Sequence, residues 1–447
     1  MKRKIILSVH VFILFFCISY NPIMAQTKLI LSLTDAIEIS LEKNRALTIA
    51  QRKVEEQQAG IGEARSLFLP QMSGDATYTK LDVAPYISLG KKSPFPMPAG
   101  SPTKITIGDD NLYDLGVNLQ QPIFTGFALR NSYVIAKESL DAAENEHETV
   151  EMDIILKTKE MYYNLLKVRK LLDISNESVA LMEAHVSDLE KMLKVGIISE
   201  NDLLKAQVQL SETKLAKIRM ENITRLTQKS FCIVLGIPIS TEIELKTPLE
   251  YTEKQVDLDM VINTALENRS EVQSLKNTIS IAKKGVSLAK SQKYPQLMAV
   301  YNFNYKRPNR EYEKEFYSVW TAGLVAHLNI FDWGGIHYKV EQAELRHRQV
   351  EESMKQLSDA IILEANQAYF NLEEASQRID VVKINVAQAE ENFRVTRKKF
   401  SQGLVTNTEL LDASTALTRA RVEQTSALSD YLVELARLER VTGKVNE

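Results

Sequence analysis

Two Glu-x-x-His pairs are the residues whose types and spacing could do chemistry in this sequence. They are Glu144 with His147 and Glu344 with His347. A carboxylate and an imidazole three residues apart lie on one face of a helix, and two such pairs can supply ligands to a di-iron site in a four-helix bundle. A di-iron helical-bundle enzyme is therefore one hypothesis for this chain.

An internal repeat argues against that hypothesis. Sliding the sequence by 207 residues aligns 122–236 with 329–443 without a gap, and sliding it by 225 aligns 33–80 with 258–305. The two Glu-x-x-His pairs are 200 residues apart, so they do not occupy equivalent positions of the repeat. No other His, Cys or Ser arrangement suggests a metal or nucleophile site, and we expect neither a cofactor nor enzymatic activity.

The start of the chain predicts export. A basic end, an apolar run over 5–18 and the small residue Ala25 are typical of a secretory signal peptide at 1–25. The apolar run is shorter than the roughly 20 residues that a spanning helix needs. Removal of the signal leaves Cys232 alone, so the exported chain has no internal disulfide. A net charge of -3 does not predict a nucleic-acid partner.

The repeat predicts two structural units, 26–257 and 258–447, that form one intertwined fold. Each unit contains a helix, two strands and a helical hairpin in the same order. The first unit has 18 extra residues between positions 80 and 122, which include the stretch SLGKKSPFPMPAGSP. Its Pro, Gly and Ser content predicts an exposed loop.

Two long segments, 127–195 and 336–402, contain neither Gly nor Pro. As helices at 1.5 Å per residue, each would be about 100 Å long. Apolar residues recur in heptads at Leu165, Leu172, Val179, Val186 and Leu193, and again at Leu372, Ile379, Val386, Phe393 and Phe400. This spacing predicts antiparallel coiled coils. Shorter helices at 33–66, 200–235, 258–292 and 407–441 are expected to flank the long ones.

Each long helix ends in a similar turn, VGIISENDLL from 195 and QGLVTNTELL from 402. Gly196 and Gly403 can take the left-handed conformation that ends a helix. Ser199 and Thr406 then open the next helix as N-caps. Thr406 with Glu409 fits a capping box better than Ser199 with an aspartate, because the usual partner is Glu or Gln. Both stretches therefore predict the tips of helical hairpins.

Four short segments, 71–78, 113–120, 297–305 and 320–326, alternate between apolar and polar residues. The pattern fits a soluble, half-buried sheet. It also fits transmembrane barrel strands, and the signal peptide and long helices favour that alternative. Four strands cannot close a barrel, which needs about eight, so several chains must contribute. Two chains would supply eight strands and three would supply twelve.

Several stretches resemble the TolC family of outer-membrane efflux channels, over about residues 30–443. They are LTDAIEISLEKN, QQPIFTG, LNIFDWGG and, as the most specific, FSQGLVTNTELLDASTALTRARVEQTSALSDYL. The resemblance implies an α+β membrane protein that forms a homotrimer. A twelve-stranded β-barrel would sit in outer-membrane lipid of a Gram-negative bacterium, and a helical tunnel (an α-barrel) would continue it through the periplasm.

The same resemblance implies a passive exit duct of a tripartite efflux or type I secretion system. Its partners would be a periplasmic adaptor (membrane fusion) protein and an inner-membrane pump of the RND, ABC or MFS type. A secreted or periplasmic coiled-coil scaffold without transport remains an alternative. Neither the cargo nor the pump class is written in the sequence.

In the family, a ring of acidic residues narrows the periplasmic end, and it falls here on Glu409 and Asp412. Six such carboxylates around one trimer axis would favour cations. The alternative is structural, because acids in a first helical turn are stabilised by the helix dipole. The first repeat has Asp202 and Lys205 at these positions, so the doubled acid belongs to the second copy alone.

The resemblance also assigns the tips to adaptor binding. These positions are Gly196, Ile197, Ile198, Ser199, Gly403, Leu404, Val405 and Thr406. Exposed apolar residues at a tip are explained by burial against a partner or by a turn that packs on itself. A family aromatic falls on Phe400, which lacks a hydroxyl, and a family arginine falls on Val405. Closure of the tunnel must therefore use other contacts, and Phe400 itself fits a heptad core residue.

Overall fold

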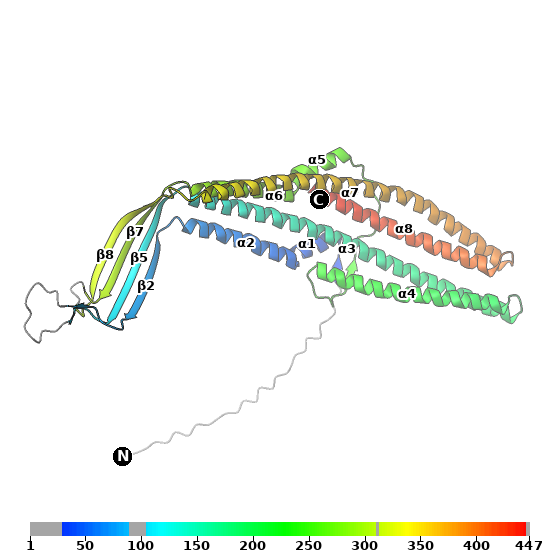
Figure 1. The fold of residues 1–447 in the computed structure, drawn as a ribbon. Helices are drawn as coiled ribbons and strands as arrows, with labels where there is room; N and C mark the ends of the chain where they lie inside the picture. The colour runs from blue at the N-terminus through cyan, green and yellow to red at the C-terminus, as the bar shows by residue number, and fades with distance from the viewer. Residues whose placement is uncertain (1–28, 89–103, 310–312, 444–447) are drawn as a thin grey trace, which may run out of the picture.

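The computed structural model describes residues 29–88, 104–309 and 313–443. A four-stranded sheet lies at one end of an elongated molecule, and the turns of two helical hairpins lie at the other (Figure 1). The expected signal peptide, 1–25, and nearly all of the expected loop over 88–102 fall outside the described residues. Within the described part, no helix is long and apolar enough to cross a membrane.

The sheet contains the four predicted strands. They are β2 (Gln71–Lys80), β5 (Asn111–Thr125), β7 (Gln296–Arg307) and β8 (Tyr317–His327), antiparallel and in the order β2-β5-β7-β8. One cross-strand row is polar, with Ser73, Asn118, Asn302 and Thr321 side by side. The next row is apolar, with Met72, Leu119, Tyr301 and Ala322. The sheet therefore has one polar and one apolar face, as the alternation predicted.

The long helices are confirmed almost to the residue. Helices α3 (Ala128–Lys194) and α7 (Gly335–Ser401) have 67 residues each. The chain then returns through α4 (Glu200–Val234) and α8 (Asn407–Thr442). Heptad residues such as Leu165 and Val186 in α3, and Leu372 and Ile379 in α7, are buried in these hairpins. Apolar packing along the heptad seam thus holds each hairpin together.

The prediction of unbroken helices over 33–66 and 258–292 was wrong. Each is broken once, into α1 (Leu33–Lys43) and α2 (Arg45–Ser66), and into α5 (Leu258–Asn268) and α6 (Ser270–Ser291). Asn44 is extended at the first break; its amide oxygen accepts from Ala46 N at 2.8 Å, and its amide nitrogen donates to Val234 O at 2.8 Å. The break therefore caps α2 and docks it on the end of α4.

Arg269 occupies the equivalent position at the second break, so a charged guanidinium group is found there in place of the Asn44 amide. Its guanidinium contacts Glu364 at 2.5 Å and Glu271 at 2.9 Å. Arg440, near the end of α8, contacts the same Glu271 oxygen at 2.6 Å and Asp153 of α3 at 2.7 Å. Arg269 is 6% exposed and Arg440 8%. The network ties α3, α6, α7 and α8 together at mid-length.

Two short strand pairs were not predicted. Strands β1 (Leu29–Leu31) and β6 (Ile243–Leu245) pair in parallel, and β3 (Tyr86–Ser88) pairs antiparallel with β4 (Lys104–Thr106). Three residues are too few to show a period of two in a sequence. The division of the chain into units at 257/258 stays a prediction.

Gly236 is a point of close backbone approach. It follows α4 with φ 69°, and a Cβ there would lie 2.3 Å from the carbonyl oxygen of Lys43. Gly196 at the first tip has a similar φ of 73°, but nothing lies within 4 Å of a Cβ built there. The two glycines thus separate the effect of backbone strain from that of a steric clash.

We expect Gly236→Ala to lower the thermal unfolding midpoint by several degrees more than Gly196→Ala. Left-handed backbone costs an alanine about 1–2 kcal/mol at either site. At 236 the methyl group must also push the α1 end away from the α4 end. Thermal unfolding of both variants in mild detergent measures the difference, and equal shifts would contradict the close approach.

Candidate functional site

Both hairpin tips end in the same backbone motif. Gly196 N donates to Leu193 O at 3.0 Å, and Ile197 N donates to Met192 O at 2.9 Å. The second tip repeats the pair, from Gly403 N to Phe400 O at 2.9 Å and from Leu404 N to Lys399 O at 3.0 Å. Both glycines have positive φ, at 73° and 74°. This Schellman arrangement satisfies the last carbonyls of each long helix, as the two sequences predicted.

The second tip has a complete capping box. Thr406 N donates to Glu409 Oε2 at 2.7 Å, and Glu409 N donates to Thr406 Oγ1 at 3.3 Å. At the first tip, Ser199 Oγ accepts from Asp202 N at 3.2 Å and donates to the Asp202 carboxylate at 2.6 Å, but the Ser199 backbone N–H makes no bond to that carboxylate, so the box is incomplete. The expected difference between the two N-caps is confirmed.

The apolar residues of the tips divide into an outward and an inward set. Ile197 is 67% exposed and its counterpart Leu404 is 68% exposed. Ile198 and Val405 are half-buried, and Ile198 packs against the buried cluster of Val186, Leu189 and Ala206 in the first hairpin. A turn packing on itself therefore explains Ile198, while burial against a partner is left to explain Ile197 and Leu404.

Glu409 and Asp412 have different surroundings. Hydrogen bonds from the Thr406 backbone N–H and then from its hydroxyl lower the pKa of Glu409. Its carboxylate therefore caps its own helix and is negatively charged at neutral pH. Asp412 is exposed and, among the described residues, forms no hydrogen bond or ion pair. Glu409 therefore has a structural role as a helix cap, whereas Asp412 has no such role.

A polar contact joins the two hairpins just behind the tips. His185 Nε2 of α3 lies 2.7 Å from Asn407 Oδ1, and Asn407 Nδ2 donates to Asp202 O at 2.9 Å. Asn407 is buried, and the Phe400 ring meets the His185 ring edge-to-face with centroids 5.5 Å apart. Phe400 also packs on the apolar core of the first hairpin, as a heptad residue should. Sequence reasoning missed His185 and Asn407, because nothing in the repeat marks either residue.

A cavity of about 420 Å³ opens beside this contact, between α3 and the second hairpin. Its walls include Met182, His185, Phe393, Arg397 and Phe400. The heptad residues Phe393 and Phe400 therefore line an open space between the two hairpins.

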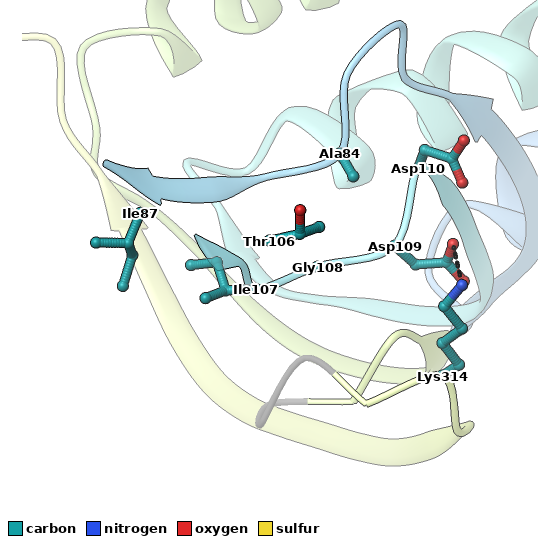
Figure 2. Close-up of a pocket in the computed structure, with 8 residues that line it drawn as sticks. All are labelled: Ala84, Ile87, Thr106, Ile107, Gly108, Asp109, Asp110 and Lys314. Carbon is teal, nitrogen blue, oxygen red and sulfur yellow. Dashed lines mark ion pairs between the residues drawn. The ribbon is translucent and has the colours of Figure 1, made fainter. Parts of the chain in front are cut away.

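A larger cavity of about 660 Å³ lies at the opposite end of the molecule, beside β3 and β4 (Figure 2). Asp109 is only 1% exposed there, and Lys314 points toward it with Nζ 3.6 Å from Oδ1. Arg307 Nη2 lies 3.5 Å from the other oxygen, Oδ2. Two cations already face this carboxylate, so the group fastens strand-end loops and is not a free ligand.

The Glu-x-x-His pairs have other contacts. Glu344 Oε1 forms an ion pair with Lys290 at 3.0 Å, and His347 Nδ1 lies 3.9 Å from Glu351. In the described part of the chain, no three His, Cys, Asp or Glu side chains gather as a group that could hold a metal. The structure therefore offers the di-iron hypothesis no support.

A sheet with one polar face, joined end to end to two hairpins of about 100 Å, fits the subunit of a duct. Comparison with known proteins agrees. The sequence profile described as "Outer membrane efflux protein" matches residues 36–230 and 261–444. The chain belongs to the outer membrane efflux protein family.

Individual relatives are distant but cover most of the chain. "Outer membrane protein TolC" of Vibrio cholerae serotype O1 is 18% identical over 347 residues, which is 76% of this chain and 78% of that protein. "Alkaline protease secretion protein AprF" of Pseudomonas aeruginosa is 20% identical over 353 residues, 76% of this chain and 71% of that protein. The crystal structure of the Campylobacter jejuni CmeC outer membrane channel superposes with a TM-score of 0.79 at 17% identity, covering 92% of this chain and 85% of that one. The resemblance, the α+β fold of the chain, the efflux-duct role and the outer-membrane location with a periplasmic tunnel are thereby confirmed, while the trimer stays a prediction.

Proposed function

We propose that three copies of this chain form the exit duct of a tripartite efflux or type I secretion system. The observation that carries the proposal is the open sheet: in the described residues, the outer edges of β2 and β8 have no partner strand. Open edges are not tolerated in lipid, so β8 of one copy would pair with β2 of the next. Three copies would supply twelve strands, the number that the family resemblance implies.

The helices support the same ring. Helices α2 and α4 continue the β2 side of the molecule, and α7 continues the β8 side (Figure 1). Exposed apolar residues follow α4 at Leu204, Val208, Leu215, Leu226 and Ile233, and follow α7 at Leu363, Phe370, Val381 and Ile384. Two different surfaces that meet head to tail close into a ring when the rotation allows it.

The first test determines the membrane in which the protein lies and the mass of its oligomer. We expect the mature chain in the separated outer membrane and, after extraction in mild detergent, a trimer by light scattering corrected for detergent. A soluble monomer or dimer in the periplasmic fraction would instead support the coiled-coil scaffold without transport.

The tips are proposed to bind the periplasmic adaptor, which would connect the duct to the inner-membrane pump of the RND, ABC or MFS type. Ile197 and Leu404 would be the apolar anchors, because they are exposed at equivalent positions of both tips. The pump would supply the energy, and the duct itself would catalyse no reaction. The chain gives no sign of which pump class it serves.

Glu409 and Asp412 are proposed to line the narrow periplasmic entrance. Three copies would bring six carboxylates around one axis, and an acidic ring selects cations. The polar contact of His185 with Asn407 would hold the two hairpins in the closed spacing, in place of the contacts that Phe400 and Val405 cannot make.

We expect Glu409→Gln with Asp412→Asn to weaken cation selectivity and block by divalent ions in planar bilayers. Glutamine can keep the capping box, so the variant removes charge without opening the helix end. The ratio of cation to anion permeability measures the effect. Unchanged selectivity would show that the acids serve the helix alone.

A further inference from the structure

The polar face of the four-stranded sheet carries one carboxylate that no cation offsets. Over the cross-strand rows from Gln71 to Thr77, the charged side chains on this face are Asp75 on β2, Asp114 on β5 and Lys306 on β7. Lys306 Nζ lies 2.6 Å from Asp114 Oδ2, so these two charges cancel. Asp75 is exposed and forms no ion pair with any described residue. Two carboxylates and one ammonium group leave a net charge of -1 per copy on these rows.

The wall of the sheet is shaped around the Asp75 carboxylate. Asn118 Nδ2 on the neighbouring strand donates to Asp75 Oδ1 at 2.6 Å. Gly116 lies directly opposite Asp75, and a Cβ built there would be 2.6 Å from Asp75 Oδ2. A side chain at position 116 would therefore displace the carboxylate from the wall. Asp75 is thus held in place within β2, away from the ends of the strand.

Closing the ring of copies adds no cation beside Asp75. In the proposed trimer, β8 of one copy lies next to β2 of the following copy. From Tyr317 to Val325, the polar face of β8 has no charged side chain, because its other members are Val319, Thr321 and Gly323. The adjoining strand therefore leaves the Asp75 charge uncompensated.

We infer that Asp75 from three copies forms an acidic ring inside the barrel that concentrates cations in the lumen. The ring favours inorganic cations and positively charged organic solutes over anions. It lies at the opposite end of the molecule from Glu409 and Asp412, so it acts independently of the periplasmic entrance. The inference rests on the proposed trimer, because only a closed barrel turns the polar face of the sheet into the wall of a lumen.

The barrel would be narrow enough for the ring to act on most of its lumen. Twelve strands spaced about 4.8 Å apart and tilted by about 40° enclose a barrel with a backbone radius of about 12 Å. The Debye length is about 10 Å in 0.1 M salt, so each carboxylate acts over most of the distance to the axis. In 1 M salt this length falls to about 3 Å, and the effect is confined to the wall.

Charge-dependent labelling of a cysteine tests the ring in outer membranes that contain the full-length mature protein. With Cys232→Ser as background, Ser73→Cys places a thiol on the polar face of β2, about 7 Å from Asp75 along the strand. Cationic and anionic methanethiosulfonate reagents are compared by their labelling rates, measured by mass spectrometry. Adding Asp75→Asn is expected to lower the cationic-to-anionic rate ratio about threefold in 0.1 M salt, and to change it little in 1 M salt.

The control removes charges without changing their sum. Asp75→Asn keeps an oxygen that accepts from Asn118, so it removes the charge and retains the hydrogen bond. Asp114→Asn with Lys306→Gln removes an ion pair one row away and leaves the net charge unchanged, so the rate ratio should stay constant. A ratio that is insensitive to Asp75→Asn, or that falls equally in this control, would overturn the ring.

Met72→Cys separates the failure of the ring from the failure of the barrel. Met72 lies on the apolar face of the sheet and is 74% exposed in the single chain. In a closed barrel this position faces lipid, where a charged reagent does not reach a thiol. Labelling of Met72→Cys at least as fast as Ser73→Cys would overturn the proposed barrel. Protection of Met72→Cys together with a ratio insensitive to Asp75→Asn would overturn the ring alone.

Discussion

Replacing Glu271 with alanine is expected to lower the free energy of unfolding by roughly 3 kcal/mol, because it removes a shared counter-ion from a nearly buried charge network. Its carboxylate lies 2.9 Å from Arg269 and 2.6 Å from Arg440, and both guanidinium groups are less than a tenth exposed. Without this carboxylate, Arg269 still contacts Glu364 and Arg440 still contacts Asp153. Both arginines lose the shared contact that links the start of α6 to the end of α8. Thermal or denaturant unfolding of the detergent-extracted protein measures the loss.

The same carboxylate makes stability depend on pH. Burial would raise the pKa of Glu271, but hydrogen bonds from Arg269 and Arg440 outweigh it and lower the pKa from 4.5 to about 2. A carboxylate whose pKa is lower in the folded state than in the unfolded state stabilises the fold at pH values above its unfolded pKa. This contribution is lost as the pH falls from about 4.5 toward 2. The shift corresponds to roughly 3 kcal/mol. Wild type should therefore lose more stability over this range than Glu271→Gln does.

Glu344→Ala provides the matched control. Glu344 also pairs with a cation, Lys290 at 3.0 Å, but both side chains are about half exposed. Exposed ion pairs contribute little, so its loss should leave the unfolding midpoint nearly unchanged. If Glu271→Ala behaved like this control, the network would be dispensable and the four helices would be held by apolar packing alone.

The sequence was sufficient to predict the long helices, the four strands and the tips, because each depends on a strong local pattern. Each 67-residue helix, which has no Pro and no Gly beyond the first residue of α7, repeats its heptad many times. The tips combine a C-terminal Gly with an N-cap three residues later, and both signals arise from backbone hydrogen bonds. Such local rules need no knowledge of the neighbours.

The parts that were not predicted depend on contacts between distant segments. Asn44 breaks a helix because its amide reaches Val234, 190 residues away. Asn407 becomes an inter-hairpin residue only because α8 lies against α3, and it is otherwise an ordinary first-turn residue. Ile197 and Ile198 have the same side chain, and only the packed turn separates the outward one from the inward one. No pattern within one segment contains this information.

Replacing Ile197 and Leu404 together with aspartate is expected to abolish efflux while the trimer yield stays unchanged. Both side chains are about two-thirds exposed, so a charge there costs the isolated subunit little. In a bound adaptor interface, each aspartate would be desolvated opposite an apolar surface, and losing such an anchor costs about 2–4 kcal/mol. A trimer repeats the two tips three times, so the losses accumulate. Growth of channel-deficient cells carrying the variant, in the presence of toxic compounds that wild type exports, measures the effect.

Two further variants separate an interface from a folding defect. Met260→Asp on α5 places the same charge at a site of equal exposure, 68%, away from the tips, and it should export normally. Ile198→Asp puts the charge against the buried core of the first hairpin, so it should lower both the yield and the thermal stability. Ile197→Asp with Leu404→Asp could instead leave export unchanged while Ile198→Asp still destabilised the protein. The tips would then be turns that pack on themselves. The adaptor would then have to bind along the sides of the hairpins.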